Sequence, residues 1–236
     1  MIHLVAETGS TNADVAAALR SGAGWAQGDW LVARRQTAGR GRQGRVWFDG
    51  SGNFMGSTVV EIAQGGPPPA SLSFVAALAV HTAIASVPDI GADPSLKWPN
   101  DVLLNGGKLS GILLEMVGAH VVVGIGVNLT KAPMIEGRKT AAVADVTAPP
   151  AVEDFADSLE GAFARQLEMW RTYGLEPILQ GFLARSLHAQ GSPVTVHDTD
   201  GSVISGSFAG LEETDGALRL RLADGRERVI RAGDIS

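Results

Sequence analysis

Three arginines alternate with glycines in the segment TAGRGRQGRVWF, which spans residues 37–48. Arg40, Arg42 and Arg45 lie in it, although the whole chain has only 19 Lys and Arg residues. Guanidinium groups bind carboxylates and phosphates through paired hydrogen bonds, and backbone N–H groups left accessible by glycines bind the same anions. This segment, called the Arg-Gly loop below, is therefore a candidate binding site for an anion with more than one charge.

Ordering the Arg-Gly loop without a ligand is unfavourable. Fixing the backbone of one residue costs roughly 1–2 kcal/mol, and the arginines repel one another. Little apolar material offsets this before Val46 and Trp47. We therefore expect a loop that is mobile when empty and ordered by its anion. Two other interpretations stay open: a solvated loop paired with surface acids, and an Arg-Gly contact to nucleic acid, which the acidic remainder disfavours.

Other polar residues interrupt apolar segments and are candidates for the same site. These residues are Ser10, Thr11 and Asn12 at an expected helix start, Asn100 and Asp101 in the motif KWPND, Lys108 directly after a Gly-Gly pair, and Asn128. Helix capping alone would account for one of the three residues at the helix start, and a turn alone would account for the motif KWPND.

The segment HVVVGIGVNL (120–129) alternates as a strand should. Its Val and Ile residues at odd positions form one face, whereas Gly124, Gly126 and Asn128 share the other. Two glycines and an amide make a poor core surface. Such a face instead suits a group that approaches the backbone closely.

Composition limits the class of protein. The 236 residues are 45% hydrophobic and 19% charged, enough for one large domain or a large and a small one. A net charge of −6 argues against a surface that binds nucleic acid or membrane as a whole. Cysteine is absent, which excludes disulfides and thiolate metal sites. The sequence shows no membrane-spanning segment and no signal peptide, so we expect a cytoplasmic protein.

The pattern also predicts the elements that position these residues. A helix over 11–21 is expected to open with a Thr11-x-x-Asp14 capping box and to end before Gly22. Strands are predicted over 29–35, 53–63, 108–117 and 120–129, with a hairpin turn at Asn105-Gly106. Further helices are predicted from Ser71, across 155–170 and across 178–182, whereas 130–150 reads as loop.

The pattern changes near residue 190. Short strands separated by Asp-Gly pairs at 200–201, 215–216 and 224–225 follow. The sequence therefore predicts an α+β protein with a central mixed β-sheet and flanking helices in a domain over 1–189. A small SH3-like β-barrel domain is predicted over 190–236.

Taken together, these motifs resemble the catalytic module of biotin protein ligases. GRGRQGRVWF is similar to the Gly-Arg loop of that family, and STN, KWPNDVLLNGGKLSGILLE and GIGVNL occur in the family's order. The resemblance covers essentially the whole chain. It implies a biotin/lipoate ligase-like fold and a two-step reaction. Biotin and MgATP form biotinyl-5′-AMP, and biotin then passes to one lysine of a biotin carboxyl carrier protein domain, such as that of acetyl-CoA carboxylase.

The resemblance also assigns residues. Lys108, Arg40 and Arg42 are implied to be catalytic. The residues implied to bind biotin are Ser10, Thr11, Asn12, Gln36, Arg40, Gly41, Arg42, Lys108 and Gly111. Those implied to bind ATP or the adenylate are Gly39, Arg45, Trp47, Asn100, Asp101 and Asn128, with Asp101 also a candidate for Mg²⁺.

Two departures and two alternatives accompany this interpretation. Only eight residues precede Gly9, too few for the DNA-binding domain of some relatives, so we expect no DNA binding and no repressor activity. The loop after Asn128 has no aromatic residue to cover an adenylate.

The alternative functions are a lipoate-type ligase or acyl transferase, and a non-enzymatic nucleic-acid-binding or adaptor protein. Relatives often pair through a sheet edge, so the resemblance also allows a homodimer.

Overall fold

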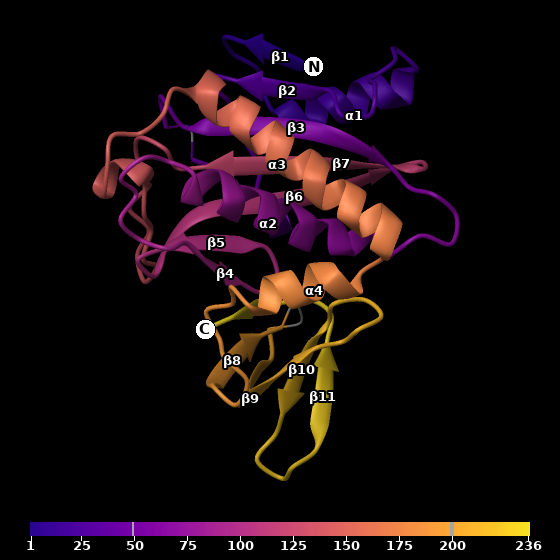
Figure 1. Cartoon of the computed structure of the whole chain (residues 1–236), viewed down its shortest axis with the longest axis vertical. Helices are drawn as coiled ribbons and strands as arrows, with labels where there is room; N and C mark the ends of the chain where they lie inside the picture. Colours follow the sequence, from indigo (N-terminus) through magenta and orange to yellow (C-terminus); the bar gives the residue numbers. More distant parts are fainter. Residues whose placement is uncertain (49, 199–200) are drawn as a thin grey trace.

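The computed structural model describes residues 1–48, 50–198 and 201–236, and it contains two sheets (Figure 1). Within these residues the larger sheet is mixed: β1 pairs parallel with β2 and the remaining neighbours are antiparallel. The predicted mixed sheet is thereby confirmed. Its strands, in spatial order, are β1 (Ile2–Val5), β2 (Trp30–Ala33), β3 (Phe54–Glu61), β7 (His120–Val127), β6 (Gly107–Val117), β5 (Asp101–Leu104) and β4 (Ser95–Lys97).

Helices cover both faces of this sheet, as predicted. α2 (Leu72–Ala85) and α3 (Val152–Tyr173) pack on one face and on each other, with α4 (Glu176–Leu183) beside them (Figure 1). α1 (Thr11–Ser21) packs on the opposite face. Short 3₁₀ turns lie at Arg42–Gly44, Pro69–Ser71 and Val143–Asp145.

The alternation predicted for β7 is confirmed. Val121, Val123, Ile125 and Val127 are at most 3% exposed and belong to the main core under α2 and α3. Burying such side chains is the dominant favourable term in folding, at about 25 cal/mol per Å² of apolar area. The other face of β7 is therefore left to carry Gly124 and Gly126, opposite the main core.

The start of α1 corrects one prediction. Ser10, not Thr11, is the N-cap residue: its Oγ accepts a hydrogen bond from the Ala13 backbone N–H at 3.4 Å. Thr11 is already helical, and Asp14 accepts from the Thr8 hydroxyl rather than closing a capping box. The prediction of a capping box at Thr11 was wrong because Ser10, one residue earlier, has an equally good capping side chain. The predicted end holds, since Gly22 takes the left-handed conformation (φ 69°) that favours glycine.

The C-terminal residues form the second sheet, which is antiparallel. Its order is β11 (Glu227–Ile230), β10 (Leu218–Arg221), β9 (Val203–Leu211), β8 (Pro193–His197) and β12 (Asp234–Ile235). The predicted small β-unit is thus present as five strands, called the C-terminal sheet below. Asp215-Gly216 and Asp224-Gly225 make turns with positive φ at each glycine. In the third predicted pair, Asp200 lies outside the described residues.

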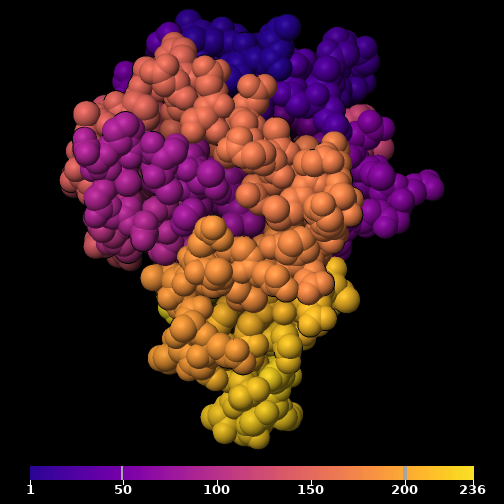
Figure 2. All heavy atoms as spheres, in the orientation of Figure 1, coloured from indigo at the N-terminus to yellow at the C-terminus, as the bar shows by residue number. Residues whose placement is uncertain are grey.

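The C-terminal sheet shares one apolar core with the larger sheet. Val196, Phe208 and Leu218 belong to the same buried cluster as the side chains under α2 and α3. The indole Nε1–H of Trp98, which is 3% exposed, donates to the Gly216 carbonyl at 3.1 Å. Figure 2 shows the C-terminal residues (yellow) packed directly beneath the rest of the chain. The position of the C-terminal sheet is therefore fixed by buried contacts.

Among the described residues, no helix combines the length and the apolar character that crossing a membrane would require.

We predict that close packing of the turn at Gly216 against the larger domain stabilises the protein. A Cβ at Gly216 would lie 2.3 Å from the Phe74 ring, so Gly216→Ala must displace a buried aromatic on α2. Gly225 has a similar positive φ (82° against 73°), but nothing lies within 4 Å of its Cβ position. In urea unfolding, Gly216→Ala should lose roughly 1–3 kcal/mol more stability than Gly225→Ala, the cost of overpacking. Equal losses would show that Phe74 does not hold this turn.

Candidate active site

A cleft of about 670 Å³ collects the predicted site residues. It lies on the glycine face of β7, and it is lined by β3, β6, the start of α1, the Arg-Gly loop, the KWPND motif, the 133–140 loop and β12. Every residue assigned to the site from the sequence lines it except Gly39. Gly39 lies behind the lining, where a Cβ would meet Gln36 Nε2 at 2.9 Å and Trp47 at 3.4 Å.

One end of the cleft is a buried polar network. The Thr11 backbone N–H donates to Gln36 Oε1 at 2.7 Å, and Thr11 Oγ1 lies 2.7 Å from Ser57 Oγ. Ser57 Oγ in turn donates to Asn12 Oδ1 at 2.7 Å. Asn12 Nδ2 is buried without a partner among the described residues. Such a donor is costly to leave unsatisfied, so this end is built to receive a ligand acceptor.

Trp47 covers the glycine face. A Cβ at Gly126 would lie 2.3 Å from the Trp47 ring, and one at Gly111 would lie 3.0 Å from it. Gly124 similarly leaves room for the Asn12 amide, 2.2 Å from its Cβ position. The glycines therefore allow an indole and an amide to contact the backbone of the sheet directly, as the pattern of β7 predicted.

A β-bulge aims Lys108 into the cleft. Leu103 on β5 pairs with Lys108 and Val102 pairs with Ser110, so Leu109 is an extra residue in β6. Leu109 and Ile112 enter the core, whereas Lys108 and Gly111 face the cleft, with Lys108 Nζ 3.5 Å from the Gly111 Cβ position. β6 lies between β5 and β7, so Lys108 is not on an edge strand. Bulges commonly redirect a side chain in this way.

Lys108 is paired in this structure. Its Nζ donates to Asp101 Oδ1 at 2.5 Å, and both side chains are partly buried. The motif KWPND supplies this partner, because Asp101 opens β5 directly opposite Gly111 on β6. The pair holds the ammonium group at a fixed position in the cleft.

The Arg-Gly loop has a defined path. Arg40 and Val46 form a bridge, the Trp47 N–H donates to the Gly39 carbonyl at 2.9 Å, and the 3₁₀ turn Arg42–Gly44 forms the tip. Gly44 takes φ 72°, where glycine is favoured. Mobility of the loop in the absence of a ligand stays a prediction.

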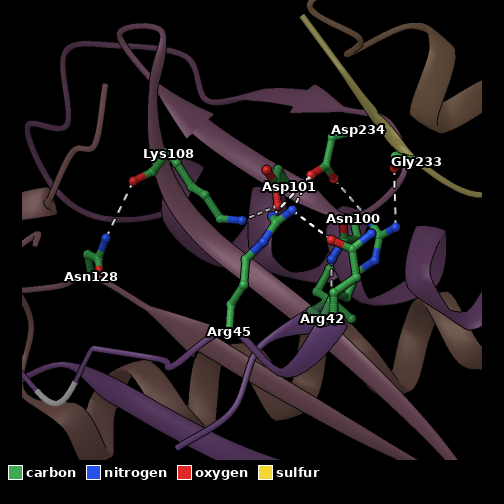
Figure 3. A network of polar contacts seen from close by, with 10 residues as sticks. Arg42, Arg45, Asn100, Asp101, Lys108, Asn128, Gly233 and Asp234 are labelled. Atoms are coloured by element: carbon green, nitrogen blue, oxygen red, sulfur yellow. Dashed lines mark hydrogen bonds and ion pairs between the residues drawn. The ribbon is translucent and has the colours of Figure 1, made fainter. Parts of the chain in front are cut away.

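Two arginines of this loop contact the C-terminal sheet (Figure 3). Arg42 Nη1 donates to Asn100 Oδ1 at 2.7 Å, and its Nη2 donates to the Gly233 carbonyl at 3.2 Å. Asp234 accepts from Arg42 Nη1 at 3.4 Å and from both terminal nitrogens of Arg45 at 3.0 Å. Pairing of loop arginines with an acid, one of the open interpretations, is thus observed, but the acid lines the cleft.

The charge of Asp234 is set by competing effects. Its partial burial alone would raise the pKa of the carboxyl group, but the hydrogen bond from Arg45 and the charges of Arg42, Arg45 and Lys108 outweigh this. The pKa of Asp234 is therefore lowered below its ordinary value. The carboxylate therefore stays ionised, and the ion pair persists, to a lower pH than for an ordinary aspartate.

Asn128 lies where β7 ends. It is 2% exposed, and its Nδ2 donates to the Ala141 carbonyl at 3.1 Å, which ties the 130–140 loop to the sheet. Its Oδ1 is buried without a partner among the described residues. The side chain thus combines a structural contact with an available acceptor in the cleft lining.

The cleft is strongly cationic, unlike the rest of the chain. Two carboxylates, Asp101 and Asp234, are the acidic side chains among its described lining. The basic lining residues are Arg40, Arg42, Arg45, Lys97, Lys108, Arg138 and Lys139. This excess suits a ligand with several negative charges.

Sequence reasoning missed several members of the site. Ser57 and Thr58 are adjacent polar residues in the middle of a strand whose other central residues are mostly apolar, a signal that was available. Arg138 and Lys139 lie on the loop after Asn128, and their charge was a weaker signal. Asp234 lies more than 180 residues from the Arg-Gly loop, so only the fold reveals this pairing.

Fold and cleft together define a two-sheet protein whose cationic cleft, beside a buried polar pocket, suits a multiply charged anionic ligand. Residues 7–128 match the model of the biotin/lipoate A/B protein ligase family, and residues 190–236 match the biotin protein ligase C-terminal domain. The chain therefore belongs to the biotin/lipoate A/B protein ligase family.

Similar proteins agree with this assignment. The chain is 41% identical to a biotin–[acetyl-CoA-carboxylase] ligase of Paracoccus denitrificans, over 98% of each chain. It is 37% identical to the ligase of that name from Mycobacterium tuberculosis, over 99% of this chain and 88% of the other. A biotin protein ligase from Aquifex aeolicus, solved with biotin and ATP, shares the fold with a TM-score of 0.85 at 24% identity, over 100% of this chain and 97% of that one.

We predict that the hydroxyl of Ser57 stabilises the polar end of the cleft. Ser57→Ala removes a buried group that contacts both Thr11 and Asn12, and should lower the free energy of unfolding by about 1–3 kcal/mol. Ser110→Ala is a matched control, because Ser110 is equally buried (0% exposed) but its Oγ has no partner among the described residues. Urea unfolding of both variants checks this, and a loss for Ser110→Ala as large as for Ser57→Ala would contradict it.

Proposed function

We propose that this chain activates biotin with MgATP to biotinyl-5′-AMP and transfers biotin to a specific lysine of a biotin carboxyl carrier protein domain. The observation that carries the proposal is the convergence of Lys108, the Arg-Gly loop and the buried Thr11–Gln36 pocket in one cationic cleft. The names of the two relatives above, each similar over the whole chain, support the same reaction.

The first step joins two anions. A carboxylate oxygen of biotin attacks the α-phosphorus of ATP, the bond from that phosphorus to the bridging oxygen of the β-phosphate breaks, and pyrophosphate leaves. Catalysis of this kind depends on positioned charge and donors. We assign Lys108 to the reacting carboxylate and phosphate oxygens, because the bulge and Asp101 fix its ammonium group. Arg40, Gly41 and Arg42 are assigned to wrap the same oxygens.

The polar end is assigned to the biotin ring system. Ser10, Thr11, Asn12 and Gln36 offer buried hydroxyl and amide groups, of which Asn12 Nδ2 is unpartnered among the described residues. A ureido group carries one carbonyl acceptor and two N–H donors, which match such a mixed set. Gly111 lies between Trp47 and Lys108 and leaves space for the acyl chain.

The nucleotide is assigned to the opposite part of the cleft. Asn128 Oδ1 is a buried acceptor without a partner in the part of the chain that the structure describes, and it is suited to an adenine amino group. Trp47 is assigned to cover the adenylate, and Gly39 and Arg45 to support the loop over the phosphates. Asn100 and Asp101 are assigned to the phosphate side, next to Arg42 and Lys108.

Mg²⁺ enters in this proposal with ATP as part of the substrate. No cluster of three or more potential metal-ligating His, Cys, Asp or Glu side chains occurs among the residues described. That fits Mg²⁺, which is commonly held by one or two carboxylates together with substrate phosphates. Asp101 is the carboxylate we assign to it, and the ion would neutralise charge that develops on the phosphates.

In the second step the lysine amine of the carrier attacks the carbonyl carbon of the adenylate. The bond from that carbon to the AMP oxygen breaks, AMP leaves, and the nitrogen loses a proton to give the amide. A closed Arg-Gly loop would exclude water from the anhydride until then. Retention of the intermediate is therefore the task we assign to the loop.

Three further assignments accompany this proposal. The catalytic domain spans 1–189 and the C-terminal domain 190–236. The protein acts in the cytoplasm. Pairing of two chains would use β1, the open edge of the larger sheet, because β4 is covered by backbone hydrogen bonds between Leu96 and residues 185–187.

The test is incubation with biotin, MgATP and a carrier domain, followed by intact mass of the carrier. We expect the carrier to gain the mass of one biotinyl group, and to gain nothing when its acceptor lysine is replaced. Modification with lipoate but not biotin would favour the lipoate-type alternative. Salt-sensitive binding of nucleic acid with no adenylate formed would favour the non-enzymatic alternative.

We predict that Lys108→Ala lowers biotin-dependent pyrophosphate–ATP exchange by about 10²–10³-fold, as expected for loss of one preorganised donor. Biotin binding should largely survive, because the Thr11–Gln36 pocket is untouched. Lys131→Ala removes the same charge from an exposed residue outside the cleft lining and should exchange at the wild-type rate. A near-normal rate for Lys108→Ala would refute its assigned role.

A further inference from the structure

Asp234 is the one carboxylate of the C-terminal sheet that lines the cleft, among the described residues. It contacts both Arg42 and Arg45, and the neighbouring Gly233 carbonyl accepts a third hydrogen bond from Arg42 (Figure 3). The short segment Gly233-Asp234 thus connects the C-terminal sheet to the Arg-Gly loop. Neither the family models nor the relatives' names assign a role to this contact.

The support of Asp234 is rigid. Ile235 next to it is 1% exposed and belongs to the main core, and Asp234 itself pairs with His197 on β8. A Cβ at Gly233 would lie 2.7 Å from the His197 carbonyl oxygen, so the backbone packs closely at this point. Asp234 is therefore held by the fold, whereas the loop arginines depend on their partners for position.

The contacts leave the arginines able to bind a ligand. A guanidinium group has five N–H donors. Arg42 directs three of them to Asn100, Asp234 and Gly233, so two remain. Arg45 likewise directs three donors to Asp234 and Gln43. Asp234 thus holds each guanidinium from one side without using all of its donors.

We propose that Asp234 is a positioning residue that fastens the Arg-Gly loop over the cleft and orients Arg42 and Arg45 for the anionic intermediate. Its ion pairs offset part of the entropy lost when the Gly-rich loop is ordered, and they reduce repulsion between the two arginines. The part concerning the intermediate rests on the function proposed above. The part concerning the loop does not.

Limited trypsin digestion of the ligand-free full chain tests the fastening directly, since the loop carries cleavage sites after Arg40, Arg42 and Arg45. We expect Asp234→Asn to speed cleavage in the loop roughly tenfold, because charge-assisted hydrogen bonds are lost. Mass spectrometry gives the rate for each site. Cleavage after Arg171 and Arg185, outside the loop, serves as the internal reference for global unfolding.

Asp224→Asn is the matched control. It makes the same charge change in the same sheet and breaks an Asp–Arg pair with Arg226, far from the loop in the β10–β11 hairpin. Loop cleavage should stay at the wild-type rate in this variant. Loop cleavage of Asp234→Asn at the wild-type rate, or an equal acceleration at loop and reference sites, would overturn the proposal.

A second comparison asks whether Asp234 acts through the arginines. In a chain with Arg42→Ala and Arg45→Ala, cleavage after Arg40 should already be fast, and adding Asp234→Asn should not change it. A further several-fold increase would show that Asp234 acts on something else and would overturn the proposal.

The last measurement concerns the intermediate. Escape of biotinyl-5′-AMP from Asp234→Asn should be roughly tenfold faster than from wild type, with Asp224→Asn unchanged. An unchanged escape rate would overturn the orienting role. If wild type forms no adenylate at all, the proposed function fails, and the digestion result still decides whether Asp234 fastens the loop.

Discussion

Repulsion between like charges is the main constraint on how the cationic side chains of this cleft are arranged. Seven cationic side chains line one cleft of a chain whose net charge is −6. They can be held together before a ligand arrives because two carboxylates stand among them, one next to Lys108 and one next to Arg42 and Arg45. Each carboxylate belongs to a strand, so the compensating charges are held by the sheets. The fold thereby supplies fixed partners for the cations of the Gly-rich loop.

The shared core explains how a residue of one sheet can serve a loop of the other. A C-terminal unit joined only by a flexible linker would let Asp234 move relative to Arg42. Here Trp98 donates across the boundary to Gly216, and Phe74 packs against that turn. Trp98 belongs to the same five-residue motif as Asn100 and Asp101, so one motif both joins the sheets and contributes to the cleft.

Much of this arrangement could be predicted from local sequence. The valine face of β7, the Asn105-Gly106 turn and the four motifs define the strands and the cleft, because each depends on periodicity or turn chemistry over a few residues. The N-cap at Ser10 was missed, since two adjacent residues both cap well. Asp234 was missed for a different reason. Its role arises from contacts with a loop more than 180 residues away, and a single sequence carries no signal for those contacts.

The extra residue Leu109 also has a consequence for changing the length of this chain. Side chains of a regular strand alternate between faces, so removing or inserting one residue between Lys108 and Gly111 would turn the ammonium group toward the helices. The turn at Asn105-Gly106 is under the same constraint, because the length of a hairpin loop sets the pairing register of its two strands. A designer who transplants this hairpin into another scaffold must therefore keep the length of the turn and copy the irregular tetrapeptide intact.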